Sequence, residues 1–258
     1  MPAPVSQFYD SIAAAYDTAM AKSFIGRLLS QRFQDCLLTQ FEGAARLLDI
    51  GCGSGTDALF LGGKGLQVYG FDVSTGMVEV ARQKAAATGL AAKVHFSVGD
   101  ATDSSTWPDG HFDGAYANFN VLNHLPDLGE FAVALSEKLQ PGAFLVVTMM
   151  NRVCLSEVLG YLLQLKFATA TRKFWSRQNT LALPMRLFFP SEAAGQLAPS
   201  FLLQEVVCLG LLVPPAQLYE GRYSRRFFEE LATWEQFLFK CRPLQRLCDQ
   251  YILILKRS

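Results

Sequence analysis

The sequence predicts an α/β fold built on a doubly wound, mostly parallel sheet of seven strands. Between Arg46 and Met150, short apolar runs typical of strands alternate with segments of helical periodicity. The first apolar run leads directly into a glycine-rich turn. The last, Ala143 to Met150, is apolar throughout, as expected of a strand buried on both faces. Such alternation implies right-handed crossovers between parallel strands.

The expected elements follow from these patterns. In chain order, the expected strands are Leu47–Ile50, Leu66–Phe71, Val94–Val98, Phe112–Asn118, Ala143–Met150, Phe201–Val213 and Tyr251–Lys256, with Met185–Phe189 as a further short strand. The expected helices are Phe8–Asp17, Phe24–Phe41, Thr56–Leu61, Gly76–Thr88, Leu128–Leu139, one capped by Ser191 that ends at Leu197, and a helical stretch within Tyr223–Asp249. Pro141 and Gly142 predict a turn before the fifth strand.

We expect a single domain over residues 1–258, with an insertion after the fifth strand. From Asn151 to Leu183 the chain is helical in pattern and rich in aromatic residues. It also carries the basic residues Lys166, Arg172, Lys173 and Arg177. This helical insertion, taken as residues 151–190, is expected to cover a substrate site or to form a homodimer surface.

Composition narrows the classes of function. Lys+Arg and Asp+Glu both number 23, and no block of like charge interrupts the chain, so the sequence carries no footprint of a nucleic-acid partner. The six cysteines are scattered without metal-ligand spacing, which predicts reduced cysteines, no metal and a cytoplasmic location. A signal peptide is not expected, and no apolar run is long enough to span a membrane.

The glycine-rich turn, Asp49-x-Gly51-x-Gly53-x-Gly55, predicts a nucleotide-binding site. Glycine adopts positive φ at low cost and lets a ligand approach the backbone. Asp49 would attract an ammonium group and would repel a pyrophosphate. Asp72 ends the next apolar run, where a carboxylate can accept hydrogen bonds from both hydroxyls of a ribose.

The main alternative is the dinucleotide-binding pattern GxGxxG. Starting at Gly51, its third glycine is replaced by Thr56, but Gly53, Gly55 and Ala58 match the looser GxGxxA form. An NAD(P)-binding oxidoreductase therefore stays open, although the chain has no Tyr-x-x-x-Lys pair.

Two further strand ends carry polar side chains, Asp100 after the third strand and Asn118 after the fourth. Ligands of open parallel sheets collect beyond the carboxyl ends of the strands. An aspartate alone is as well explained by a helix cap or a turn. Four such strand ends in succession argue for a binding site.

The segment Leu47 to Asp72 resembles motif I of the class I S-adenosylmethionine-dependent methyltransferases. Phe8-Tyr9-Asp10-x-Ile12-Ala13-x-x-Tyr16-Asp17 is similar to the leader of many small-molecule members, in which a tyrosine covers the cofactor. The resemblance implies the Rossmann-like methyltransferase fold, S-adenosyl-L-methionine as cofactor, and N-terminal helices (residues 1–42) over its site. Tyr16 is the expected covering residue, with an ordinary packing helix as the alternative.

The resemblance also implies a role for each residue of the site. The methionine part of the cofactor would meet Gly51, Cys52, Gly53 and Gly55, its ammonium group would lie near Asp49, and its ribose hydroxyls would bond to Asp72. The adenine would pack against Val73 and Met77, and its amino group would bond to Asp100, with Ala101 alongside. The sulfonium would lie near Asn118.

The implied reaction is in-line displacement of a methyl group onto a small-molecule acceptor. The protein would align the reacting atoms at roughly 3 Å and exclude water. His124 is the candidate base for a hydroxyl acceptor, with loop ordering or packing on the cofactor as the alternative, and Asn118 is the second candidate catalytic residue. The aromatic insertion suggests an aromatic or lipid-like acceptor. A third reading is a methyltransferase fold that binds the cofactor without transferring methyl groups.

Overall fold

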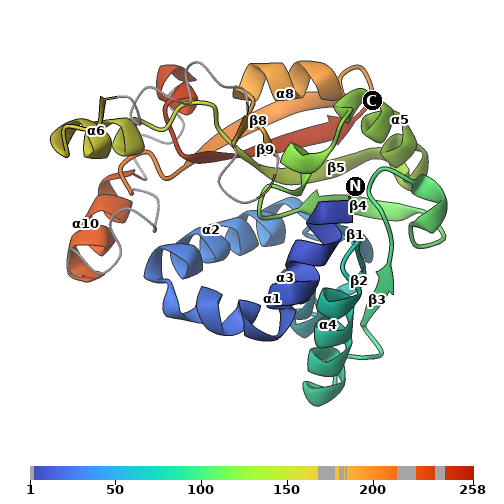
Figure 1. Ribbon diagram of the computed structural model, residues 1–258. Helices are drawn as coiled ribbons and strands as arrows, with labels where there is room; N and C mark the ends of the chain where they lie inside the picture. The colour runs from blue at the N-terminus through green and yellow to red at the C-terminus, as the bar shows by residue number, and fades with distance from the viewer. Residues whose placement is uncertain (1–2, 168–177, 180–182, 184, 214–224, 236–241) are drawn as a thin grey trace.

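A twisted central sheet carries helices on both faces in the computed structural model, which describes residues 3–167, 178–179, 183, 185–213, 225–235 and 242–258 (Figure 1). The sheet has seven strands in the order β3-β2-β1-β4-β5-β9-β8. The bounds are β1 Arg46–Ile50, β2 Gln67–Asp72, β3 Val94–Val98, β4 Phe112–Ala117, β5 Leu139–Met150, β8 Phe201–Leu209 and β9 Gln250–Arg257. Strands β1 to β5 pair in parallel, and β9 pairs antiparallel with both β5 and β8. The predicted fold class is confirmed.

Helices cover both faces of the sheet (Figure 1). Their bounds are α1 Ala3–Lys22, α2 Phe24–Gln40, α3 Thr56–Gly63, α4 Thr75–Ala87, α5 Leu128–Lys138, α6 Leu155–Leu163, α8 Pro190–Leu197 and α10 Arg225–Glu235, with 3-10 turns η1 Ser104–Thr106, η2 Val121–His124 and η3 Arg242–Arg246. Buried side chains of α2, α3 and α4 pack in one hydrophobic core with the sheet, and those of α5 and α8 pack in the other. No helix of the described residues is long and apolar enough to cross a membrane.

The strand order reverses between β1 and β4. From β1 the chain moves outward through β2 to β3, and it then returns to the other side of β1 with β4. Crossovers on the two sides of this point diverge, which leaves a crevice beyond the carboxyl ends of β1 and β4. Asp49 pairs with Gly70 of β2 and Tyr116 of β4, so its side chain lies at this crevice.

The predicted turn at Pro141 and Gly142 is wrong, because both residues lie within β5. Leu139 already pairs with Phe112 of β4, and the register shifts between Phe112 and Gly114. Gly142 has a φ of 77°, so it accommodates this irregularity within the strand. At the other end of the sheet, β8 stops at Leu209 rather than at Val213, because Gly210 turns the chain with a φ of 72°.

The predicted helical insertion is helical only in part. Helix α6 is present, but Gln178–Asn179 (β6) and Met185–Arg186 (β7) form a two-stranded antiparallel sheet. Much of the segment, residues 168–177, 180–182 and 184, lies outside the described residues. Its role as a substrate cap or dimer surface therefore stays a prediction.

The start of the next helix differs from the prediction. Helix α8 begins at Pro190, with Phe189 rather than Ser191 at the N-cap. Proline suits the first helical position because its missing N–H would have no partner there. Glu192 Oε2 accepts a hydrogen bond from the Phe189 amide at 3.0 Å, which satisfies the start of the helix.

Candidate functional site

The three glycines of the turn after β1 all have positive φ, of 68° at Gly51, 50° at Gly53 and 76° at Gly55. They serve different purposes. A Cβ on Gly51 would lie 2.6 Å from a methyl of Val121, and one on Gly55 would lie 2.7 Å from the ring of Phe96. A Cβ on Gly53 would meet nothing within 4 Å. Packing therefore excludes side chains at Gly51 and Gly55, whereas Gly53 leaves space beside the backbone open.

Asp72 joins this turn to the start of α4. Its Oδ2 accepts a hydrogen bond from Gly53 N at 2.9 Å, and its Oδ1 accepts one from Ser74 N at 2.9 Å. Ser74 in turn caps α4 by accepting a bond from the amide of Met77. Burial raises the pKa of Asp72, although these backbone bonds oppose the shift.

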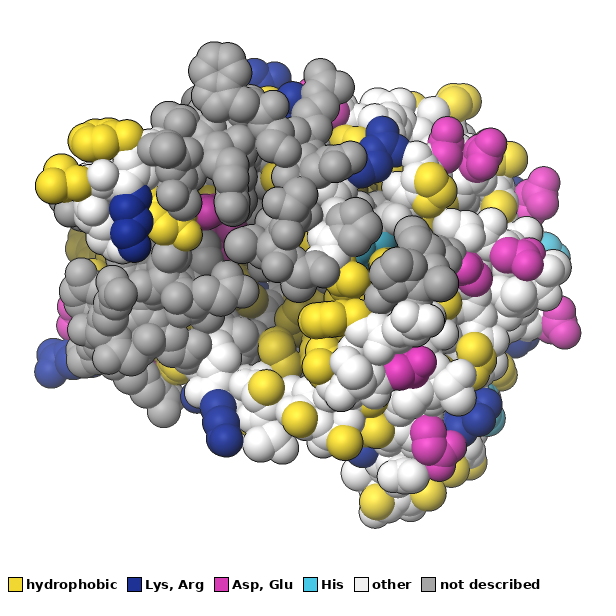
Figure 2. Space-filling model, in the orientation of Figure 1, with side chains coloured by type: hydrophobic (Ala, Val, Ile, Leu, Met, Phe, Trp, Pro, Cys, Tyr) yellow, Lys and Arg dark blue, Asp and Glu magenta, His cyan; other side chains and the backbone are white. Residues whose placement is uncertain are grey.

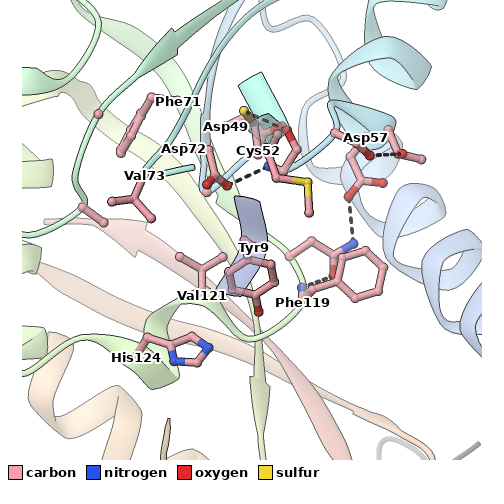
Figure 3. A pocket seen from close by; sticks show the side chains of 18 of the residues that line it. Tyr9, Asp49, Cys52, Asp57, Phe71, Asp72, Val73, Phe119, Val121 and His124 are labelled. Atoms are coloured by element: carbon pink, nitrogen blue, oxygen red, sulfur yellow. Dashed lines mark hydrogen bonds between the residues drawn. The ribbon is translucent and has the colours of Figure 1, made fainter. Parts of the chain in front are cut away.

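A cavity opens above the glycine turn and, with its mouth, encloses about 800 Å³ (Figure 3). The expected residues that line it are Tyr16, Asp49, Gly51, Cys52, Gly53, Asp72, Val73, Met77, Ala101, Asn118 and His124. Most come from α1 and from the ends of four neighbouring strands, as the crevice between β1 and β4 requires, while Met77 lies in α4 and His124 in η2.

Two expected residues do not line this cavity. Gly55 faces Phe96 instead. Asp100 lies beside the cavity residues Gly99 and Ala101, but its Oδ1 accepts hydrogen bonds at 2.8 Å from the amide and the hydroxyl of Thr102. This local turn directs the carboxylate toward its own loop. Contact between Asp100 and adenine stays a prediction.

The cavity is acidic. Asp49, Asp57 and Asp72 all line it, and no Lys or Arg occurs among the described residues that do. Burial raises the pKa of Asp49 well above its ordinary value, and the negative charge of Asp57 raises it further. Burial also raises the pKa of Asp57. Three carboxylates in one closed space favour a ligand that brings positive charge.

Sequence reasoning missed Asp57, which lies in the first turn of α3. It accepts hydrogen bonds from Gln34 Nε2 and Asn118 Nδ2, both at 2.8 Å. Asn118 Oδ1 accepts bonds from Phe119 N at 2.8 Å and Thr148 Oγ1 at 3.1 Å. The Asn118 amide is thus occupied in holding the wall of the cavity. The available signal was an acidic residue directly after the glycine turn, where the positive end of the helix dipole favours it.

The backbone after β4 is strained. Phe119 and Asn120 have φ values of 51° and 65°, a left-handed conformation that is costly for residues other than glycine. The turn directs the Phe119 ring to the cavity (Figure 3). Asn123 then fixes η2, because its side chain is bonded to Met150 and to the Arg186 carbonyl. This anchor presents His124 to the same cavity.

Helix α1 closes the cavity from the side of the N-terminus. Val5, Tyr9 and Tyr16 line it, so Tyr9 lies there as well as the expected Tyr16. In Figure 3 the Tyr9 ring lies between Asp72 and His124. Burial raises the pKa of both tyrosine hydroxyls, so both stay protonated. Each can then donate a hydrogen bond to a ligand.

Two aspartates attach α1 to the elements that form the site. Asp10 Oδ1 accepts bonds from Ser74 Oγ at 2.6 Å and Gly76 N at 2.8 Å. Asp17 accepts a bond from Ser54 Oγ at 2.5 Å and pairs with Lys84 Nζ at 2.7 Å. The helix over the cavity is thus held by the glycine turn itself and by the helix that follows Asp72.

One group of side chains in the described part of the chain has metal-ligand chemistry. A ligand atom of each of Cys154, Glu157 and Asp249 lies within 4.8 Å of the others, next to the first turn of α6. Each has other interactions in the structure. The positive end of the α6 dipole also disfavours a cation there. The group is not among the residues that line the acidic cavity.

Comparison with known proteins finds matches to the region that forms the cavity. Residues 47–142 match the family model described as a methyltransferase domain. The probable chloroplastic tocopherol O-methyltransferase of Oryza sativa subsp. japonica is 37% identical over 108 residues, which are 41% of this chain and 29% of the relative. The 2-phytyl-1,4-naphtoquinone methyltransferase of Synechococcus elongatus is 32% identical over 155 residues, 58% of this chain and 65% of the relative. The matches thus span less than two thirds of either relative.

Solved structures share the fold over most of the chain. The [4+2]-cyclase SpnF has a TM-score of 0.68 at 20% identity, over 98% of this chain and 96% of that one. A geranyl diphosphate C-methyltransferase from Streptomyces coelicolor A3(2), in complex with Mg²⁺, geranyl diphosphate and S-adenosyl-L-homocysteine, has a TM-score of 0.59 at 15% identity, over 89% and 81% of the two chains. The family model covers the glycine turn and the strand ends that form the cavity. Over residues 47–142 the chain is therefore similar to methyltransferase domains.

Proposed function

We propose that this protein transfers a methyl group from S-adenosylmethionine to a small-molecule acceptor. The observation that carries the proposal is the charge of the cavity, in which three carboxylates, two of them buried, meet no Lys or Arg among the described lining residues. A sulfonium and an ammonium group would be attracted there, whereas the two phosphates of NAD would be repelled. The acidic cavity thus favours this cofactor over a dinucleotide.

The residues at the cavity fit the parts of this cofactor. Asp49 would take the ammonium group, and Asp72, already held by Gly53 and Ser74, would take the ribose hydroxyls. The open space beside Gly53 supports an approach of the methionine part to the backbone. Val73, Met77 and Ala101 supply an apolar wall for the base.

When bound, the cofactor supplies a methyl group on a positively charged sulfur. The chain would contribute alignment and exclusion of water, with α1 closing the cavity through Tyr9 and Tyr16. An acceptor hydroxyl would lose its proton as the new bond to carbon forms, and His124 is the titratable lining residue that can accept one near neutral pH. The catalytic role expected of Asn118 stays a prediction; its amide donates to Asp57 and accepts from the Phe119 amide.

The relatives support an aromatic or lipid-like acceptor. Their names specify tocopherol, 2-phytyl-1,4-naphtoquinone and, in Clavibacter sepedonicus, demethylmenaquinone as the molecules that they methylate. We therefore propose a phenol or quinol with an apolar substituent as acceptor. A cytoplasmic location remains a prediction from the cysteine pattern.

Two measurements test this function. Calorimetric titration should show binding of S-adenosylhomocysteine and no binding of NAD. Transfer of labelled methyl from S-adenosylmethionine to a panel of alkyl-substituted hydroquinones and phenols should then give a labelled product. Tight binding of NAD alone would replace the proposal with an oxidoreductase.

The fold does not by itself fix the reaction, since the cyclase SpnF has the same architecture. Cofactor binding without transfer to any acceptor of the panel would favour a methyltransferase fold that binds the cofactor but does not transfer methyl groups.

Replacement of His124 by Gln tests the proposed base. We expect methyl transfer to a phenol to slow by about 10²-fold while the affinity for S-adenosylhomocysteine is retained.

A further inference from the structure

Asp57 is a buried carboxylate in the wall of the acidic cavity, and it forms no ion pair with a Lys or Arg of the described residues. It lies in the first turn of α3. Its Oδ1 accepts a hydrogen bond from Gln34 Nε2 and its Oδ2 accepts one from Asn118 Nδ2, both at 2.8 Å. Both donors are neutral amides, so they satisfy the carboxylate oxygens without balancing a negative charge.

The contacts of Asn118 fix the direction of its bond to Asp57. Asn118 Oδ1 accepts from the Phe119 amide at 2.8 Å and from the Thr148 hydroxyl at 3.1 Å, so Nδ2 is the atom that meets the carboxylate. Burial raises the pKa of Asp57, whereas the two side-chain bonds and the charge of Lys84 lower it. An N–H donor at each oxygen favours the ionised carboxylate.

Lys84 does not balance this charge inside the cavity. Its Nζ lies 2.7 Å from Asp17 Oδ2, and Lys84 is not among the described residues that line the cavity. The other two carboxylates of the cavity have roles in the proposed cofactor site, Asp72 toward the ribose and Asp49 toward the ammonium group. Asp57 is therefore the carboxylate that remains for a second positive charge.

Phe119 adds an aromatic ring on the side of the cavity where Asp57 lies. Figure 3 shows these two residues toward one side and Asp72 with Val73 toward the other. The left-handed conformation of Phe119, with a φ of 51°, directs its ring to the cavity. A sulfonium donates no N–H hydrogen bond, so a protein can attract it through negative charge and through the face of an aromatic ring.

The negative charge of the cavity is internal. Asp49 and Asp57 are 3% and 6% exposed. On the face drawn in Figure 2, acidic side chains lie dispersed among basic and apolar ones, in a chain whose Lys+Arg and Asp+Glu are equal at 23. Charges interact more strongly in a closed site than in water, because the effective dielectric constant is lower. A ligand that loses one positive charge in this cavity should therefore lose affinity.

We propose that Asp57 makes the cavity bind the charged methyl donor more tightly than the uncharged product. This role rests on the proposed function, because it requires the same cofactor in the same cavity. Methyl transfer to a phenol breaks the bond from sulfur to the methyl carbon and leaves the electron pair on sulfur, which becomes a neutral thioether. A bond from oxygen to carbon forms, and the phenol loses its proton. The attraction of Asp57 for the sulfonium ends with that charge, which favours release of the product.

Calorimetry at pH 8 with three ligands tests this role without requiring methyl transfer. S-adenosylmethionine and sinefungin carry a positive charge at the reacting position, and S-adenosylhomocysteine does not. The wild type should bind each charged ligand at least about tenfold more tightly than S-adenosylhomocysteine. Asp57→Asn should bring the three affinities within about threefold of one another, mainly by weakening the charged ligands. Asp57→Ser, a second neutral variant, should do the same.

The comparison is internal to each variant, so a general loss of folded protein does not change the ratio of affinities. Asp113→Asn is the matched control, because Asp113 also accepts two hydrogen bonds, from the amides of Ala45 and Arg46, but is not among the described residues that line the cavity. It should keep the preference of the wild type. Asp49→Asn should weaken all three ligands alike, since each carries the amino-acid ammonium group.

Equal binding of S-adenosylmethionine and S-adenosylhomocysteine by the wild type would overturn the role of Asp57, and so would an unchanged preference in both Asp57 variants. A preference for S-adenosylmethionine that sinefungin does not share would also overturn it, because the methyl group rather than the charge would then be recognised. In these cases the cofactor still binds, and the proposed function stands. If the wild type binds none of the three ligands, the proposed function fails and the role of Asp57 fails with it. The expected preference without transfer to any acceptor would support Asp57 and remove methyl transfer.

Discussion

Burial of the ionised Asp49 carboxylate is unfavourable in the protein without ligand. The residue is 3% exposed, and burial raises its pKa, with Asp57 and Asp72 nearby to raise it further. Asp49 therefore tends to keep its proton until a cation enters the cavity. A ligand ammonium group would favour the ionised form, so binding should release a proton and should strengthen as pH rises.

Replacement of Asp49 by Asn should change stability in a pH-dependent way. Between the unfolded pKa, about 3.9, and the raised folded pKa, folded Asp49 keeps a proton that the unfolded chain has lost. Stability of the wild type consequently falls with rising pH in this window, by up to about 1.4 kcal/mol per pH unit. An asparagine side chain cannot ionise, so the variant should become more stable relative to the wild type from pH 5 to pH 8. Urea unfolding at several pH values measures this, and a constant difference would contradict the account.

Replacement of Gly53 by a larger residue should weaken ligand binding. Gly53→Ala places a Cβ in the open space of the cavity and forces alanine to a φ of 50°, which costs roughly 1–2 kcal/mol. Gly43→Ala is the matched control, because Gly43 has a φ of 80° and also has nothing within 4 Å of its Cβ position, but it does not line the cavity.

Both alanine variants should lose similar stability in thermal unfolding. In calorimetry, only Gly53→Ala should weaken the binding of S-adenosylhomocysteine, by about tenfold or more. Equal affinities in the two variants would mean that the space beside Gly53 does not receive the ligand.

At this scale the sequence predicted the site through its backbone pattern. Asp49 and Asp72 were found because their place relative to the glycines decides what they meet. Asp57 was missed, and Tyr16 was preferred to Tyr9, because the place of these residues at the cavity depends on how α3 and α1 rotate about their axes, which a single helical pattern does not fix. Asp100 does not line the cavity, because a local bond from Thr102 holds its carboxylate, and its contact with adenine stays a prediction.

Among the elements, α1 depends on two aspartates for its position over the cavity. Asp17→Asn removes the charge that pairs with Lys84 and weakens the bond from Ser54. The pair is partly exposed, so its contribution is at most about 1 kcal/mol. The affinity for S-adenosylhomocysteine should fall about threefold to fivefold, and cleavage within α1 by a protease should become faster.

The control for this variant is Asp35→Asn, which removes an exposed carboxylate from the neighbouring helix α2. It should leave both affinity and cleavage unchanged. If Asp17→Asn binds the ligand as tightly as the wild type, the contacts of Asp17 do not couple α1 to the site.

Helix α10 is held by one buried carboxylate. Glu235 accepts hydrogen bonds from the amides of Gly210, Leu212 and Val213, each at 3.0 Å, and pairs with Arg32 of α2 at 2.6 Å. Glu235→Ala leaves these donors without partners, so it should lower the free energy of unfolding by about 3 kcal/mol or more. Thermal unfolding measures this loss. The exposed Glu230→Ala on the same helix should cost less than about 0.5 kcal/mol.

Strands and helices before Met150 were predictable because each buries a regular face against the sheet. The errors fell where a local feature overrides the pattern. A bulge absorbs Pro141 and Gly142 into β5, and Pro190 moves the start of α8 ahead of Ser191. The hairpin of β6 and β7 has strands of two residues, which is too short to leave a period in the sequence.

For the whole molecule, the strand order explains why the acidic cavity is formed mainly by the first part of the chain. The sequence up to β5 surrounds the switch point between β1 and β4 and therefore the proposed cofactor site. Residues after β5 add the antiparallel β9 and β8 to the far edge, and α6 and α10 to one end. The family model ends at residue 142. Beyond it the sequence patterns predicted strands at β8 and β9 and a helix at α8, but not the short hairpin of β6 and β7.

The central claim is that the acidic cavity binds a cationic adenosyl amino acid. Its most direct test is calorimetry of wild type and Asp49→Asn with two ligands, S-adenosylhomocysteine and 5′-methylthioadenosine, which lacks the ammonium group. The account predicts that Asp49→Asn loses about tenfold to hundredfold in affinity for the first ligand and almost none for the second. An equal loss for both ligands, or no loss for either, would contradict it.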